Sequence, residues 1–136
     1  MSDSAVQPYG VGPLGSTENL EGLFYSQNGS TSGGTFTFTS SRIGELLVVD
    51  QIEVVLYGAS PTQWYVQLKD TTYGTVFFHD SQSIGEGLGI RFYWRGRKPL
   101  NNGWGIAVIV NLISGSGPAS YGIEMRGYTR VTTWAP

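Results

Sequence analysis

Apolar and polar residues that alternate with a period of two constrain the fold of this chain more than any other feature. The alternation begins at residues 35–39, which read Thr-Phe-Thr-Phe-Thr, and it is clearest at residues 88–95, where every second residue is large and apolar. Successive side chains of a β-strand point to opposite faces of the sheet, so each stretch predicts a strand with one buried face. No window places apolar residues three and four apart over the length of a helix. The chain is therefore predicted to be all-β.

Turn-rich segments divide the alternating pattern into seven or eight predicted strands. They include residues 35–39, 46–57, 64–69, 75–79, 88–95, 104–112 and 121–131. The length of 136 residues suits one domain, and a charged fraction of only 13% with 20 glycines suits strands and turns. We expect an antiparallel β-sandwich that is jelly-roll-like. An immunoglobulin-like sandwich is the alternative, but the chain has no cysteine for the Cys…Trp…Cys pattern of that fold.

The first 34 residues differ from the rest because no strong period runs through them. Residues 1–18 are punctuated by Pro and Gly and predict a flexible segment. The apolar cluster at residues 19–25 has two interpretations: a first strand or strap over the core, or an arm that becomes ordered on a partner. We divide the chain into a flexible N-terminal arm, residues 1–34, and a β-sandwich domain, residues 35–136.

Composition excludes several classes of function. The net charge of −2 provides no positive field for nucleic acid or for an acidic membrane surface, so we expect neither as a partner. The N-terminus lacks the pattern of a signal peptide, and the longest apolar run is far shorter than the roughly 20 residues that a spanning helix needs. The absence of cysteine removes thiolate catalysis and cysteine-ligated metal sites.

The single histidine and its position in a predicted strand argue against a catalytic triad. His79 is followed by Asp80, and adjacent residues of a strand face opposite sides, so Asp80 is badly placed to orient His79. We therefore predict that the protein is not an enzyme, with no catalytic residue, cofactor or metal. A calcium ion held between the turns at residues 70–74 and 80–87 stays as an alternative.

Half of the eight basic residues lie close together, in the predicted strand at residues 88–95 and directly after it. Tyr93 stands between two of them, a mixture that can bind single-stranded nucleic acid, although the acidic balance of the chain favours a patch that meets an acidic protein surface. The four basic residues are Arg91, Arg95, Arg97 and Lys98. The tryptophans on alternating apolar faces are predicted to be core. Carbohydrate binding remains an alternative through the tyrosines Tyr57, Tyr65, Tyr93 and Tyr128.

Residues 90–108 read IRFYWRGRKPLNNGWGIAV, in which an aromatic strand ends in a Gly turn and a corner leads into a strand of small and branched residues. This element resembles one in tailed-phage capsid decoration (cement) proteins and in related small jelly-roll virion structural proteins. The resemblance implies a non-enzymatic protein that binds and stabilises a phage head shell as a homotrimer. The implied partner is the major capsid protein, on the capsid surface, after synthesis in the host cytoplasm. It implies no functional residue at a particular position.

The alternative function is a receptor- or carbohydrate-binding module of a phage tail or head fibre. For the decoration protein, the arm would contact the partner through its apolar cluster, and the body through its basic surface. The predicted contact residues are Leu20, Leu23, Phe24 and Tyr25 in the arm, and Arg91, Tyr93, Arg95, Arg97 and Lys98 in the body.

Overall fold

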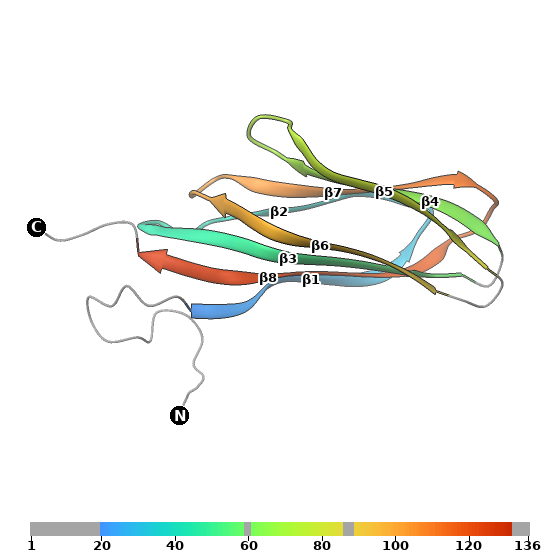
Figure 1. The fold of residues 1–136 in the computed structure, drawn as a ribbon, viewed down its shortest axis with the longest axis horizontal. Helices are drawn as coiled ribbons and strands as arrows, with labels where there is room; N and C mark the ends of the chain where they lie inside the picture. Colours follow the sequence, from blue (N-terminus) through green and yellow to red (C-terminus); the bar gives the residue numbers. More distant parts are fainter. Residues whose placement is uncertain (1–19, 59–60, 86–88, 132–136) are drawn as a thin grey trace, which may run out of the picture.

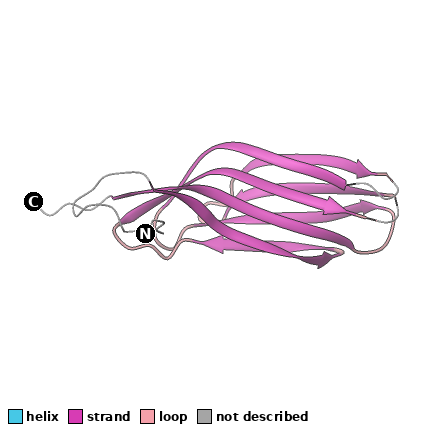
Figure 2. Cartoon of the chain, turned by 90° about the horizontal axis from the view of Figure 1, so that it is seen from below, coloured by secondary structure: helices cyan, strands magenta, loops and turns pink. Residues whose placement is uncertain are grey.

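The computed structural model describes residues 20–58, 61–85 and 89–131 of the chain, the side chains of residues 20, 21 and 131 excepted. The described residues form eight strands and contain no helix that could cross a membrane (Figure 2). The strands are β1 (Leu20–Thr31), β2 (Gly33–Thr39), β3 (Glu45–Tyr57), β4 (Thr62–Asp70), β5 (Val76–Ile84), β6 (Gly89–Leu100), β7 (Gly105–Ser114) and β8 (Ala119–Val131).

Two four-stranded antiparallel sheets lie face to face (Figure 1). Sheet I has the order β1-β8-β3-β6 and sheet II has the order β2-β7-β4-β5. The first strand pairs with the last, the second with the seventh, the third with the sixth and the fourth with the fifth. This nested pairing is that of one long hairpin rolled into a double sheet, which is the jelly roll. The predicted fold class is confirmed.

Strand β1 changes the domain boundary that the sequence predicts. It pairs with β8 along its whole length, from Leu20 opposite Thr129 to Thr31 opposite Ala119. Residues 20–34 therefore belong to the sandwich as β1 and the start of β2, so the expected boundary at residue 35 is wrong for this segment. The register shifts between Leu23 and Tyr25, and this bulge breaks the period of two that would have revealed the strand. Residues 1–19 of the expected arm lie outside the described residues.

The core fills the space between the two sheets. Its fully buried members come from the central strands β3 and β4, from their neighbours β6, β7 and β8, and from the end of β5 at Ile84. Trp64 is completely buried, and its indole Nε1 donates a hydrogen bond to Thr62 Oγ1 at 2.7 Å, so its one polar atom is satisfied. Each such side chain contributes about 1.5–3 kcal/mol through burial. Trp64, Val66, Leu68, Phe92, Ile106 and Ile123 are representative of this layer.

A bulge in β3 sets which side chains reach the surface. Its register against β6 and β8 shifts between Val49 and Gln51. The residues that pack in the core are odd-numbered before the shift, Leu47 and Val49, and even-numbered after it, from Ile52 onward. A Cβ atom at Gly127 would collide with the carbonyl oxygen of Val48, so a glycine is needed where β8 passes the bulge. The extra residue, Asp50, is thereby left next to Gln51 at the surface.

Candidate interaction surfaces

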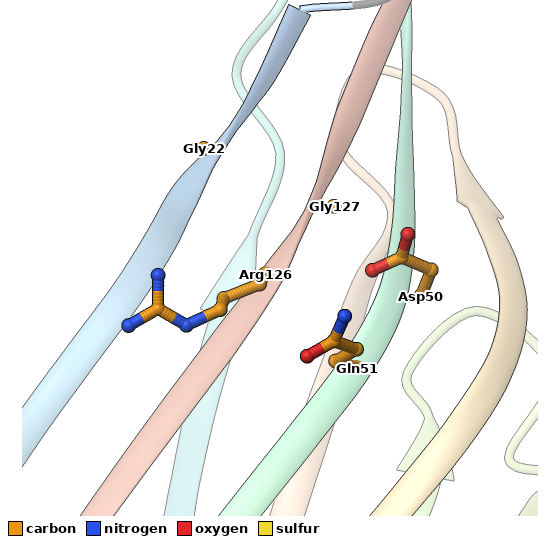
Figure 3. Close-up of a pocket in the computed structure, with 5 residues that line it drawn as sticks. All are labelled: Gly22, Asp50, Gln51, Arg126 and Gly127. Atoms are coloured by element: carbon orange, nitrogen blue, oxygen red, sulfur yellow. The ribbon is translucent and has the colours of Figure 1, made fainter.

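A shallow polar hollow lies on the outer face of sheet I. The pairing places Glu53 of β3 between Tyr93 of β6 and Glu124 of β8. Gln51, Glu53, Arg91, Tyr93, Glu124 and Arg126 line it. A second hollow adjoins it and shares Gln51 and Arg126; Figure 3 shows these with Asp50, Gly22 and Gly127.

Asp50 and Glu53 line neighbouring hollows on one face of sheet I. Residues three apart in a regular strand face opposite sides, which is what the sequence alone predicts for this pair. That prediction is wrong because the bulge at Asp50 shifts the alternation by one residue. The bulge thus gathers acidic and polar groups that the sequence pattern separates.

Ion pairs balance the charges of the first hollow. Arg91 Nε is paired with Glu53 Oε2, and Arg126 Nη2 lies 3.0 Å from Glu124 Oε1. The Arg91 guanidinium carbon also lies 4.6 Å from the centre of the Tyr93 ring. Without the arginines, the two glutamates would repel each other as direct neighbours on adjacent strands. The outer face of sheet I therefore carries a mixture of positive and negative charges, and it is not the basic patch that the residues of β6 alone predict.

The structure separates Lys98 from the other basic residues of β6. It lies on the inward side of the strand, with Nζ 3.0 Å from Asp70 Oδ2 and 5.0 Å from the centre of the Phe77 ring. Arg91, Arg95 and Arg97 are exposed, because odd-numbered residues of β6 face outward and even-numbered ones inward. The expectation that all four form one surface is wrong for Lys98, which bridges the two sheets.

Asp70 is nearly buried and has three donors. Its Oδ1 accepts hydrogen bonds from the backbone N–H groups of Thr72, at 2.6 Å, and of Tyr73, at 3.2 Å, while Oδ2 faces Lys98. Burial by itself would raise the pKa of the Asp70 carboxyl, but these donors and the charge of Lys98 together hold that pKa below its ordinary value. One of the carboxylates that the calcium alternative needs is thus already bound to Lys98 and to the backbone of the β4–β5 turn.

The predicted apolar contact residues of the arm lie partly on the core. Phe24 and Tyr25 are half-buried and pack against it, and the Tyr25 ring centre lies 5.9 Å from that of Phe38. Burial, with a smaller effect of the nearby Tyr121, raises the pKa of the Tyr25 hydroxyl. Leu23 is 41% exposed, and the side chain of Leu20 lies outside the described part. Leu23 is thus more exposed than Phe24 and Tyr25, the other two predicted arm contacts whose side chains the structure describes.

The tyrosines of the carbohydrate alternative do not form one platform. Tyr93 lines the hollow of sheet I, whereas Tyr65 belongs to sheet II, where its ring centre lies 6.0 Å from that of His79. An aromatic pair that the sequence pattern did not indicate lies at the turns: Tyr73 is 74% exposed and meets Trp104 edge-on at 5.9 Å. These two residues are 31 positions apart, and only the packing of two turns brings them together.

No family model matches the sequence, and no curated protein does either. A chain of infectious bursal disease virus, strain Gx, has a TM-score of 0.45 and 10% identity; the match covers 88% of this chain and 33% of that one, so this chain spans about a third of its length.

Two further solved structures have similar scores. An endospore appendage protein of Bacillus, described as forming disulfide-linked pili, has a TM-score of 0.42 and 10% identity over 93% of this chain and 100% of that one. The virus-like particle of the extra small virus of the prawn Macrobrachium rosenbergii has a TM-score of 0.42 and 10% identity, and the match covers 93% of this chain and 92% of that one. At these scores the likenesses carry no argument about function.

Proposed function

We propose that the protein is a non-enzymatic structural component of a virion, and more specifically a capsid decoration protein that stabilises a phage head shell. The observation that carries the proposal is the strand order, β1-β8-β3-β6 over β2-β7-β4-β5. This eight-stranded double sheet is an architecture that viral capsid modules use, as do lectins and cupins, so the step from fold to function is an analogy. The resemblance of residues 90–108 to decoration proteins supports the proposal of a phage head.

In this role the sandwich acts as a rigid block that bridges neighbouring capsid subunits. Contacts of standard size bury about 1,600 Å², and exposed charges at such an interface set register and association rate more than affinity. The proposed contacts are the exposed residues of β6 and the apolar residues of β1. They are Arg91, Tyr93, Arg95 and Arg97, with Leu20, Leu23, Phe24 and Tyr25. A homotrimer on the shell surface is the proposed assembly.

The test is co-sedimentation with empty shells assembled from the major capsid protein encoded in the same genome. We expect saturable binding and a shell that resists heat better when the protein is bound. Replacing Arg95 with Glu should weaken binding at least tenfold if the β6 surface makes the contact. Ser81→Glu, an exposed change on β5 of the opposite sheet, is the matched control. A protein that neither binds nor stabilises the shells would contradict the proposal.

A receptor- or glycan-binding module of a fibre is the second candidate, and the exposed Tyr73 favours it. Tyrosine and tryptophan side chains at an exposed turn offer apolar ring surface together with polar atoms. Titration with a panel of oligosaccharides, followed by tryptophan fluorescence, tests this function. A saturable change that disappears in Tyr73→Ala would support it, and no change with any sugar of the panel would count against it.

A further inference from the structure

Strand β2 has an open edge. It is the outermost strand of sheet II, with β7 on one side, and among the described residues no strand pairs with its other edge. Phe36 and Phe38 turn inward and pack against the core, while Thr35, Thr37 and Thr39 are exposed. An open edge presents backbone N–H and C=O groups that can pair with another strand.

The hydrogen bonds of Ser40 show which residues present these groups. The Ser40 N–H donates to Trp104 O at 2.8 Å, and Ser40 O accepts from the Gly103 N–H at 2.8 Å, so both backbone groups of Ser40 are directed toward the β7 side. The direction alternates from residue to residue in an antiparallel ladder. Positions 34, 36 and 38 therefore face β7, and the N–H and C=O groups of positions 35, 37 and 39 face the open edge.

Strand β2 has none of the sequence features that usually prevent an edge strand from pairing with another strand. Natural sheets protect edges with lysine, proline, bulges or inward charges. Residues 33–41 contain no charged residue and no proline, and the register of β2 against β7 shows no shift. Two copies of this edge would therefore meet without repulsion between like charges.

The sequence of the edge is also symmetric, so two antiparallel copies of it place like residue types opposite each other. Thr35-Phe36-Thr37-Phe38-Thr39 reads the same in both directions around Thr37. With a two-fold axis at Thr37, Thr35 lies opposite Thr39 of the partner subunit, and Phe36 lies opposite Phe38 of the partner subunit. The residues that face each other across hydrogen bonds in this register are the three threonines, whose backbone groups point outward.

We propose that β2 pairs with β2 of a second copy of this chain about a two-fold axis at Thr37, which joins two copies of sheet II into one eight-stranded sheet. The contact is isologous, so it produces an even number of subunits. If the three-fold assembly proposed above also forms, the complete particle is a hexamer of two trimers. The edge contact itself does not depend on a role in a virion.

Charge pairs placed on the open edge test both the contact and its register. In Thr35→Lys/Thr39→Lys, an ammonium group at position 35 faces another at position 39 of the other copy. In Thr35→Lys/Thr39→Glu the same positions bring opposite charges together twice. Both variants change only exposed side chains, so we expect circular dichroism spectra and melting temperatures like those of the unchanged chain.

Native mass over a concentration series is the readout. We expect two or six times 14.8 kDa for the unchanged chain, at least a tenfold higher dissociation constant for the Lys/Lys variant, and assembly retained in the Lys/Glu variant. Three results would overturn the proposal: a monomer or a trimer for the unchanged chain, a Lys/Lys variant that assembles as well as the unchanged chain, or a Lys/Glu variant that dissociates as readily as Lys/Lys.

Discussion

The two long sides of the sandwich have the same architecture, but the edge strands of only one side are protected against pairing with a further strand. On one side β5 and β6 are the outer strands of the two sheets, and on the other side β1 and β2 are. Strand β6 carries Pro99, four basic residues and a register shift near Gly96, all of which discourage further pairing. Strand β2 carries none of these, and β1 between Tyr25 and Thr31 is uncharged as well.

Side chains also close the β5–β6 side across the two sheets. Gln82 Nε2 of β5 donates to the carbonyl oxygen of Arg91 in β6 at 2.8 Å, which occupies a backbone acceptor at that edge. Phe77 and Trp94 meet edge-on with ring centres 5.0 Å apart, and Lys98 reaches Asp70 of β4. We infer that this side is built to remain unpaired, and that assembly uses the β1–β2 side.

Deletion of residues 1–30 should have the largest effect, because it removes nearly all of β1 and uncovers β8. We expect loss of the cooperative unfolding transition in thermal circular dichroism. Deletion of residues 1–18, which leaves β1 whole, should keep the melting temperature within about 4 °C of the full chain, a shift that corresponds to about 1 kcal/mol for a domain of this size. A longer deletion that still folds cooperatively would mean that β1 is dispensable to the sandwich.

Trp94→Ala should destabilise the closed side by about 3 kcal/mol, because it removes a large ring that packs on Phe77 and on the core. Thr37→Ala on the open side should change the free energy of unfolding of the monomer by less than about 0.5 kcal/mol. Urea unfolding of both variants, at concentrations where the chain is monomeric, measures the difference. Equal decreases in the free energy of unfolding for the two variants would contradict the proposed difference between the closed and the open side.

Asp70→Asn should cost about 1.5–3 kcal/mol at neutral pH, because it removes the charge that Lys98 and two backbone N–H groups stabilise. The pKa of Asp70 is lowered by folding, so its contribution is complete above the unfolded-state pKa and is lost as the pH falls through the folded-state pKa. The stability of the unchanged chain should therefore fall more steeply in acid than that of Asp70→Asn. Parallel curves of unfolding free energy against pH would contradict this role.

Glu53→Gln should have the smallest effect, within about 0–1 kcal/mol, since its pair with Arg91 lies at the surface. The change should decrease further in high salt, where surface charges are screened. If chemical unfolding shows that the free energy of unfolding falls by more than about 2 kcal/mol, the ion pairs on the outer face of sheet I stabilise the fold itself.

The sequence predicted the seven strands from β2 to β8 and did not decide on β1. The segment at β1 was left open between a first strand and an arm, because Phe24 is inserted at its bulge. The bulge at Asp50 likewise made the prediction that Asp50 and Glu53 face opposite sides wrong. A bulge depends on the neighbouring strand, which a local pattern does not contain. The acidic partners of β6 also lie far away in the sequence. Glu53 precedes Arg91 by 38 residues, and only the pairing of β3 with β6 brings the two together.

Cross-linking through a single introduced thiol tests the central claim most directly, since the chain has no cysteine of its own. A two-fold axis at Thr37 would place the two Cα atoms of position 37 about 5.5 Å apart, within the roughly 4.4–6.8 Å that a disulfide spans. After mild oxidation, Thr37→Cys should run mostly as a covalent dimer on a non-reducing gel. Ser81→Cys, exposed on the closed side, should remain a single chain. A Thr37→Cys variant that cross-links no faster than Ser81→Cys would contradict the account.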